Sequence, residues 1–155
     1  MNWNIKCIRY GLLAVIVPLL LAACGSNGTA WGTGAFRSNG ERIYFTATSE
    51  RSTAITYTGG PASSGGMMGG GRLACASCHG PDGRGGVHAM TGMQTMTATD
   101  IRWSVLQNMF DAEQFRLAVT KGQDHNGTQL NTDMPHWNIG GDDLADLIAY
   151  LKTLP

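Results

Sequence analysis

The sequence predicts an all-α domain, and the two main observations lie in its second half. Asp111 stands as an N-cap with Gln114 at the reciprocal capping-box position, and Gly122 stops the apolar repeat that follows. In residues 142–152, apolar side chains recur at i, i+3, i+4 and i+7, with aspartates early and a lysine late, as the helix dipole favours. A third observation is the segment 75–79, whose two cysteines are spaced by about one helical turn.

Residues 1–23 are expected to be a lipoprotein signal peptide. Lys6 and Arg9 give a positive start, and the apolar run that follows is too short to span a bilayer. The closing segment Leu21-Ala22-Ala23-Cys24 resembles a bacterial lipobox, in which Cys24 receives the lipid. An ordinary signal peptide, with Cys24 left as a free thiol, is the alternative. We therefore expect a protein of the cell envelope, anchored to a membrane by lipid and facing the periplasm or the cell exterior.

Residues 24–39 are predicted to form a flexible tether, and residues 40–155 the folded domain. Gly, Ser, Thr and Asn dominate the tether, which has few apolar positions. Once Lys6 and Arg9 leave with the signal peptide, nine Lys and Arg face eleven Asp and Glu, a net charge of −2. No basic run or face appears in the sequence, so nucleic-acid binding is not expected.

A first helix that begins at Gly40 is expected to be followed by an insertion at about residues 46–71. Within it, the alternating and β-branched stretch 54–58 predicts a short strand or hairpin. The glycine-rich run 59–71 cannot hold a packed element, because glycine loses the most backbone entropy on ordering. Two interpretations of this run stay open: a loop over the edge of a cofactor, or a connection with no role beyond its length.

The motif Cys75-Ala76-Ser77-Cys78-His79 is the pattern by which one haem is attached covalently, as haem c. Each thiol adds to one vinyl group of the porphyrin, and His79 places its imidazole on the iron. A zinc site would need two further ligands at similar spacing, and a thioredoxin-like dithiol would need a βαβ context. The sequence provides neither. Cys7 leaves with the signal peptide and Cys24 takes lipid, so no cysteine remains for a disulfide.

The motif is followed by a group of residues with two interpretations, namely His88, Met90, Met93 and Met96. Thioethers together with one imidazole suit Cu(I), so a copper site is the first. The second is that these methionines line an apolar haem pocket, where flexible side chains fill irregular gaps.

The second axial ligand of the iron must come from a distant, non-helical segment that crosses the face opposite His79. Met134 is the first candidate, because it lies 55 residues beyond His79 and Pro135 holds its backbone extended. The competing histidines and methionines are His136 and His88, then His125, Met90, Met93, Met96 and Met109.

These motifs together resemble the class I monohaem cytochromes c. The similarity is most specific at residues 75–79, good from Asp111 to Pro155, and weaker at Gly40 with Tyr44. In that family a first helix with such a glycine–aromatic pair crosses the C-terminal helix, so the resemblance implies that Tyr150 packs near Gly40. The expected fold is therefore the class I cytochrome c fold, with about three to five helices around one covalent haem.

The resemblance also implies roles for single residues. It makes Met134 the distal ligand, makes the carbonyl of Pro81 the acceptor of the imidazole N–H of His79, and makes Trp103 or Arg102 a hydrogen-bond donor to a haem propionate. By the same resemblance the protein is a one-electron carrier and not an enzyme, either a shuttle or a subunit of an oxidoreductase system, with other redox proteins as its partners. The alternatives are a haem-based sensor or peroxidase-like protein with an open sixth site, and a copper-handling accessory protein.

Overall fold

The structure is a computed structural model that describes residues 35–51, 54–61, 73–89 and 95–155. The expected signal peptide, Cys24 and most of the expected tether lie outside the described residues, as does the greater part of the glycine-rich run. Within the part of the chain that the structure describes, no helix has both the length and the apolar character needed to cross a membrane.

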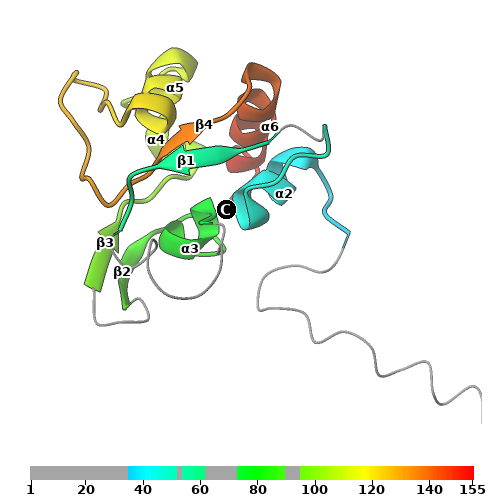
Figure 1. Cartoon of the computed structure of the whole chain (residues 1–155), viewed down its shortest axis with the longest axis horizontal. Coiled ribbons are helices and arrows are strands. Elements are labelled where there is room, and N and C mark those ends of the chain that lie inside the picture. The colour runs from blue at the N-terminus through cyan, green and yellow to red at the C-terminus, as the bar shows by residue number, and fades with distance from the viewer. Residues whose placement is uncertain (1–34, 52–53, 62–72, 90–94) are drawn as a thin grey trace, which may run out of the picture. The chain divides into compact units, whose positions relative to one another are not determined.

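Helices and short strands alternate along the described residues (Figure 1). The helices are α2 (Asn39–Thr46), α3 (Cys75–His79), α4 (Trp103–Leu106), α5 (Ala112–Lys121) and α6 (Gly141–Leu151). The strands are β1 (Thr56–Thr58), β2 (Gly86–Ala89), β3 (Thr95–Ala98) and β4 (His136–Asn138).

The prediction of a purely helical domain is too narrow, because two small antiparallel sheets accompany the helices. β1 pairs with β4, and this sheet confirms the strand predicted at residues 54–58. Tyr57 lies opposite Trp137 in that sheet, with ring centroids 5.2 Å apart. β2 pairs with β3 in a hairpin that the sequence analysis did not predict. Part of the insertion therefore belongs to the folded domain, since its strand β1 pairs with β4, which follows Met134.

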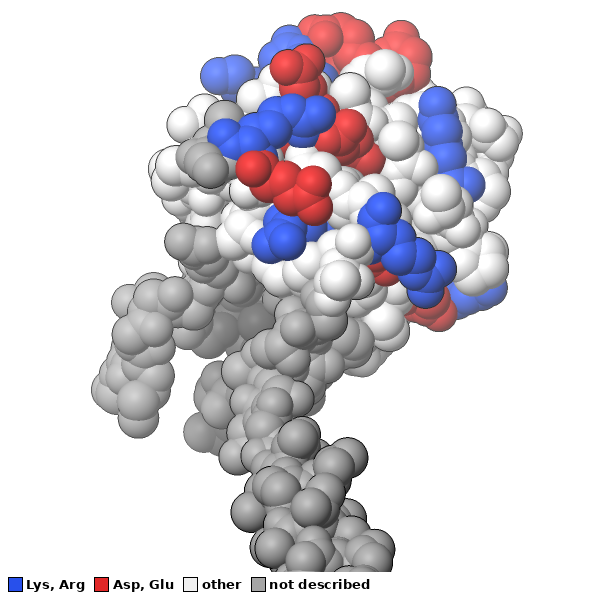
Figure 2. Space-filling model, turned by 90° about the vertical axis from the view of Figure 1, so that its right-hand side faces the viewer, with Lys and Arg blue, Asp and Glu red and all other residues white. Residues whose placement is uncertain are grey.

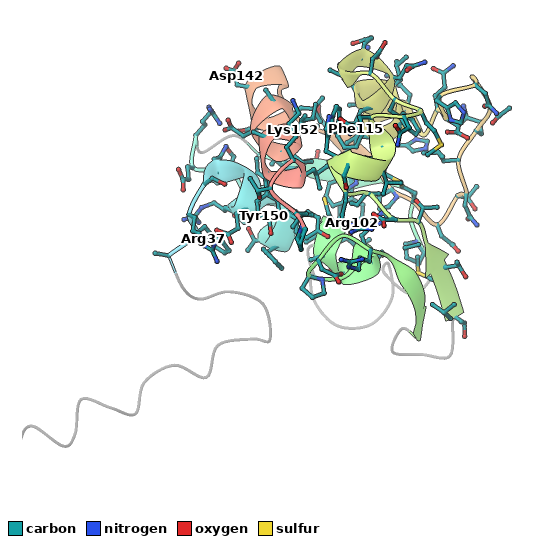
Figure 3. All side chains as sticks on the ribbon, turned by 180° about the vertical axis from the view of Figure 1, so that it is seen from behind. Arg37, Arg102, Phe115, Asp142, Tyr150 and Lys152 are labelled. Carbon is teal, nitrogen blue, oxygen red and sulfur yellow. The ribbon has the colours of Figure 1, made fainter. Side chains whose placement is uncertain are left out.

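Helix α2 crosses α6 at a glycine, as expected. A Cβ atom on Gly40 would lie 2.0 Å from the carbonyl oxygen of Asp146 and 2.8 Å from Cβ of Tyr150, so only glycine allows this approach. Tyr150 projects from α6 toward α2 (Figure 3). The expected contact between Tyr150 and Gly40 is confirmed. Ser38 caps α2 by accepting a hydrogen bond from the backbone N–H of Glu41, so the helix begins inside the expected tether.

The two helices predicted in the second half of the chain, α5 and α6, are also confirmed. For α5, the predicted residues at both ends of the helix are confirmed as well. At the start of α5, the carboxylate of Asp111 accepts from the N–H of Gln114, whose side chain accepts from the N–H of Asp111. Gly122 ends α5 in the left-handed region, with φ of 64°. Helix α6 covers Gly141–Leu151, and its apolar stripe faces the core through Leu144, Leu147 and Leu151.

Helices α2, α5 and α6 and strand β4 share one apolar core. Tyr44 and Leu151 are its most deeply buried large side chains, with at most 1% of their surface exposed. Several residues of this core line a cavity instead of packing against each other. The candidate functional residues described next line the same cavity.

Candidate functional site

The cysteine–histidine motif forms the single short helix α3. The backbone N–H of Ala74, just before the helix, donates to the hydroxyl of Ser77, which satisfies one donor at the helix start. Gly80 ends the helix with φ of 75°. Both cysteines have free thiols and are half-buried. One helical turn therefore presents Cys75 and Cys78 in the same direction, as attachment to one macrocycle edge requires.

The imidazole of His79 is oriented by a backbone carbonyl. Its Nδ1 lies 2.8 Å from the carbonyl oxygen of Thr99, the residue that follows β3. With Nδ1 donating, the neutral ring carries its lone pair on Nε2, which is then the nitrogen that can bind a metal. The acceptor expected from the resemblance, the carbonyl of Pro81, is wrong in this chain. Pro81 lies in an exposed turn next to the helix end.

Gly85 explains how the carbonyl of Thr99 reaches His79. Its φ is 70°, and a Cβ atom there would lie 2.3 Å from the carbonyl oxygen of Ala98 and 2.5 Å from that of Thr99. The N–H of Gly85 also donates to the carbonyl of His79, at 2.9 Å. The missing side chain thus lets the loop after α3 lie directly against the end of β3. Thr99 had no sequence signal, because a backbone carbonyl carries no residue signature.

The motif faces an apolar cavity. Its described lining includes Cys75, Cys78 and His79 on one side and Met134 from the segment before β4. The walls are mostly aliphatic and aromatic, with a polar border at residues 131 and 133; the larger apolar members are Ile43, Ile55, Leu73, Phe115, Val119, Leu130, Trp137, Leu147 and Leu151. A flat, largely apolar macrocycle fits this lining, with two thiols and an imidazole placed to hold it.

The thiols sit in an environment that disfavours charge. Burial raises the pKa of the Cys75 thiol to about 12 and raises the pKa of Cys78 as well. Exposed, reactive cysteines show the opposite behaviour, with a lowered pKa next to positive groups. The two thiols are therefore suited to lie against an apolar cofactor edge, and not to act as a surface dithiol.

The cavity separates the candidate axial ligands into two groups. Of the described candidates, Met134 and Met96 line the cavity, whereas His125, His136 and Met109 do not. His136 lies at the outer side of α5, where its ring occupies the space next to Gly122. His125 is exposed beside Asp124, and Met109 is 45% exposed. The side chain of His88, and Met90 and Met93, lie outside the described residues, so the copper interpretation stays a prediction.

Met96 and Met134 reach the cavity from different elements. Met96 is buried on β3, the strand that leads directly to Thr99, the partner of His79. Met134 comes from the turn before β4, where its N–H donates to the carbonyl of Asn131. Met96 and Met134 therefore come to the same cavity from two different segments of the chain.

Trp103 is not among the described residues that line the cavity, and its expected role at a haem propionate stays a prediction. Its ring packs edge-on against Phe115, with centroids 5.9 Å apart, and the ammonium of Lys152 lies 5.2 Å from its centroid. Figure 3 shows Lys152 and Phe115 close together on this side of the molecule. Arg102, the neighbour of Trp103, forms an ion pair with the carboxylate of Asp100, with 2.6 Å between the paired nitrogen and oxygen atoms.

Tyr44 is a positioning residue that the sequence analysis missed. Its hydroxyl donates to the carbonyl of Gly80, directly after His79, at 2.5 Å. Burial raises its pKa well above the usual range. The pair Gly40 and Tyr44 indicated a helix crossing, but the pattern did not show that Tyr44 also holds the end of the haem motif.

Comparison with known proteins agrees with this geometry. The family model described as Cytochrome c matches residues 72–155, more than half of the chain, and includes the motif, the segment of Met134 and α6. No curated protein and no solved structure matches the chain. With the motif on one helical turn facing an apolar cavity, the chain belongs to the cytochrome c family, adopts the cytochrome c fold, and is an electron-transfer protein that binds one haem c covalently.

Proposed function

We propose that this protein is a lipid-anchored, class I one-electron carrier whose haem iron is held between His79 and Met134. The observation that carries the proposal is that Met134 lines the same apolar cavity as both thiols and the imidazole. The proposal extends to its system: the protein acts as a shuttle or an electron-transfer subunit, between redox proteins in the cell envelope.

In this proposal haem supplies a one-electron iron couple, and a methionine ligand opposite a histidine raises the reduction potential of the iron. The chain's own residues contribute in three ways. Thr99 fixes the tautomer and orientation of His79. The apolar walls exclude water, and Met134 fills the last axial position. With both axial positions filled, no position is left for a substrate, which favours a carrier over a peroxidase-like or sensor function.

The axial ligand is tested by the spectrum of the ferric protein. We expect the weak near-infrared sulfur-to-iron charge-transfer band in the parent, and its loss in Met134→Ala. Met96→Ala is the matched control, because Met96 also lines the cavity but comes from β3, three residues before Thr99, the partner of His79. The control should keep the band.

Other spectra would contradict the proposal in different ways. A band that survives in Met134→Ala and disappears in Met96→Ala would assign the ligand to Met96. A low-spin spectrum without the band would indicate a histidine ligand. A high-spin parent would mean an open sixth position and would favour the sensor or peroxidase-like function.

The lipid anchor is supported by the sequence around Cys24 and is tested separately. In the full-length protein, Cys24→Ser removes the thiol that would take the lipid. We expect this variant to move from the membrane fraction to the soluble fraction after cell lysis, with an unchanged haem spectrum. Equal distribution of parent and variant would show that residues 1–23 are an ordinary signal peptide.

A further inference from the structure

A second concave surface lies on the other side of the cavity wall. It is bordered by β1, by the last two turns of α5 and by β4. We call it the Lys121 groove, after Lys121 at the end of α5; its other charged, imidazole, hydroxyl and amide side chains are Arg116, His136, Thr56, Tyr57, Thr58, Thr120 and Asn138. None of these residues has a role in haem binding.

The Lys121 groove has one sign of charge. Lys121 and Arg116 line it together with His136, the first residue of β4, and the described lining contains no Asp or Glu. Arg116 is partly neutralised by Glu113, with 2.5 Å between the paired nitrogen and oxygen atoms. Lys121 forms no ion pair with any residue the structure describes. The groove is thus locally positive in a mature chain of net charge −2.

Another face of the molecule carries positive and negative side chains side by side, unlike the Lys121 groove. Figure 2 shows the side of the domain that carries α2 and α6, where Lys and Arg lie among Asp and Glu. Ion pairs account for much of this mixing, among them Arg42 with Glu50 and Arg51 with Asp143. A charged partner would find little net attraction on that face.

Trp137 connects the Lys121 groove to the haem cavity. It lines both, is only 9% exposed, and packs with a tilted ring against Tyr57 across the β1–β4 sheet. Trp137 is therefore part of the wall between the groove and the cavity. Short separation is what electron transfer between two proteins needs, and complementary charge is what directs their encounter.

We propose that the Lys121 groove is a docking surface for an acidic segment of a redox partner protein. The inference rests on the proposed electron-carrier function. One electron passes between the haem iron and the partner's redox centre, so one centre is oxidised as the other is reduced, and no atom is transferred. Lys121 attracts the acidic side chains, and the hydroxyls of Thr56 and Thr58 and the amide of Asn138 offer hydrogen bonds to the partner's backbone.

The test uses poly-L-glutamate as the acidic probe and the full-length, haem-loaded ferrous protein in neutral detergent. Backbone amide resonances are followed by NMR at low salt; carbon monoxide is added if the sixth position proves open. The readout then works whether or not Met134 is the ligand. We expect saturable shifts that cluster at residues 56–58, 120–121 and 136–138 and fade as salt is added.

The decisive variants reverse the charge of one lysine each. Lys121→Glu should weaken poly-L-glutamate binding roughly tenfold, whereas Lys152→Glu, on the far end of α6, should change it less than about twofold. Equal effects of the two variants, or shifts that map to another face, would overturn the proposal. Saturable shifts of the same residues by inorganic phosphate, at the same affinity per anion, would also overturn it in favour of a small-anion site.

Discussion

Tyr44 joins the first helix to the end of the haem motif through one hydrogen bond. The acceptor, the carbonyl of Gly80, also receives the N–H of Gly83, at 3.4 Å. Removing the hydroxyl therefore weakens this acceptor's bonding without leaving it entirely unpaired. The residue ties the packing of α2 to the position of His79, one residue before Gly80.

We expect Tyr44→Phe to lower the free energy of unfolding at pH 7 by about 1–2 kcal/mol. Chemical denaturation measures this, with Tyr150→Phe as the control, since no hydrogen bond of the Tyr150 hydroxyl is found among the described residues. A loss in Tyr150→Phe as large as in Tyr44→Phe would show that the bond to Gly80 contributes nothing specific.

The same tyrosine makes stability depend on alkaline pH. Its pKa in the folded state is raised above 10.0, chiefly by burial, so the folded state keeps a proton that the unfolded state loses. Stability from this group is complete below pH 10.0 and falls as the pH rises above it toward the folded pKa. The decline above pH 10.0 should be shallower in Tyr44→Phe than in the parent.

At the scale of elements, the crossing of α2 and α6 depends on the absence of one side chain. The alanine Cβ in Gly40→Ala would meet a backbone carbonyl and Cβ of Tyr150, neither of which can rotate away. We expect a loss of about 1–3 kcal/mol in the free energy of unfolding, despite the better helix propensity of alanine. Gly141→Ala, in α6 with nothing within 4 Å, should be neutral or slightly stabilising.

The elements that sequence reasoning predicted are those whose signals are local. The capping box at Asp111, the apolar stripe of α6 and the five-residue motif each depend on neighbours in the chain, and each is where it was expected. The β2–β3 hairpin was missed because, among the side chains described in these two strands, only Met96 is buried, while Val87 is 69% exposed. Alternation between an apolar and a polar face is therefore weak in these strands.

The residues of the candidate site also divide into those that the sequence predicted and those that it did not. Cys75, Cys78, His79 and Met134 were predicted from their side chains, and the structure brings them to one cavity. Thr99 acts through its carbonyl and depends on the close approach of Gly85, so no side-chain pattern identifies it. Trp103 was assigned by analogy alone; it packs against Phe115, which lines the cavity, but it is not itself part of the described lining.

At the scale of the whole molecule, a polar cluster joins segments about a hundred residues apart. Asp143 on α6 is 1% exposed, and its carboxylate accepts hydrogen bonds from Asn39, Ser49 and Arg51. Asp146, one turn further along α6, is bonded by Asn39 and Arg51 as well. The cluster therefore holds the start of α2 and the segment after it against α6, whose Leu147 and Leu151 form part of the haem cavity.

This cluster should set how the protein responds to acid. The hydrogen bond from Arg51 is the main cause that lowers the pKa of Asp146 below 3.8. A lowered folded pKa gives stability that is present above pH 3.8 and is lost as the pH falls through the folded value. We expect Arg51→Gln to lower the melting temperature at pH 7 and to flatten its decline below pH 3.8.

The matched control is Arg116→Gln, which breaks the exposed pair with Glu113 on the outside of α5. Exposed pairs contribute little, so its melting temperature should stay close to the parent's at every pH. Circular dichroism and the haem absorption should report the same transition in Arg51→Gln, because α6 contributes both to the helix crossing and to the cavity. Haem absorption that changes at a different pH from the loss of helix would show that the cluster and the cavity are independent.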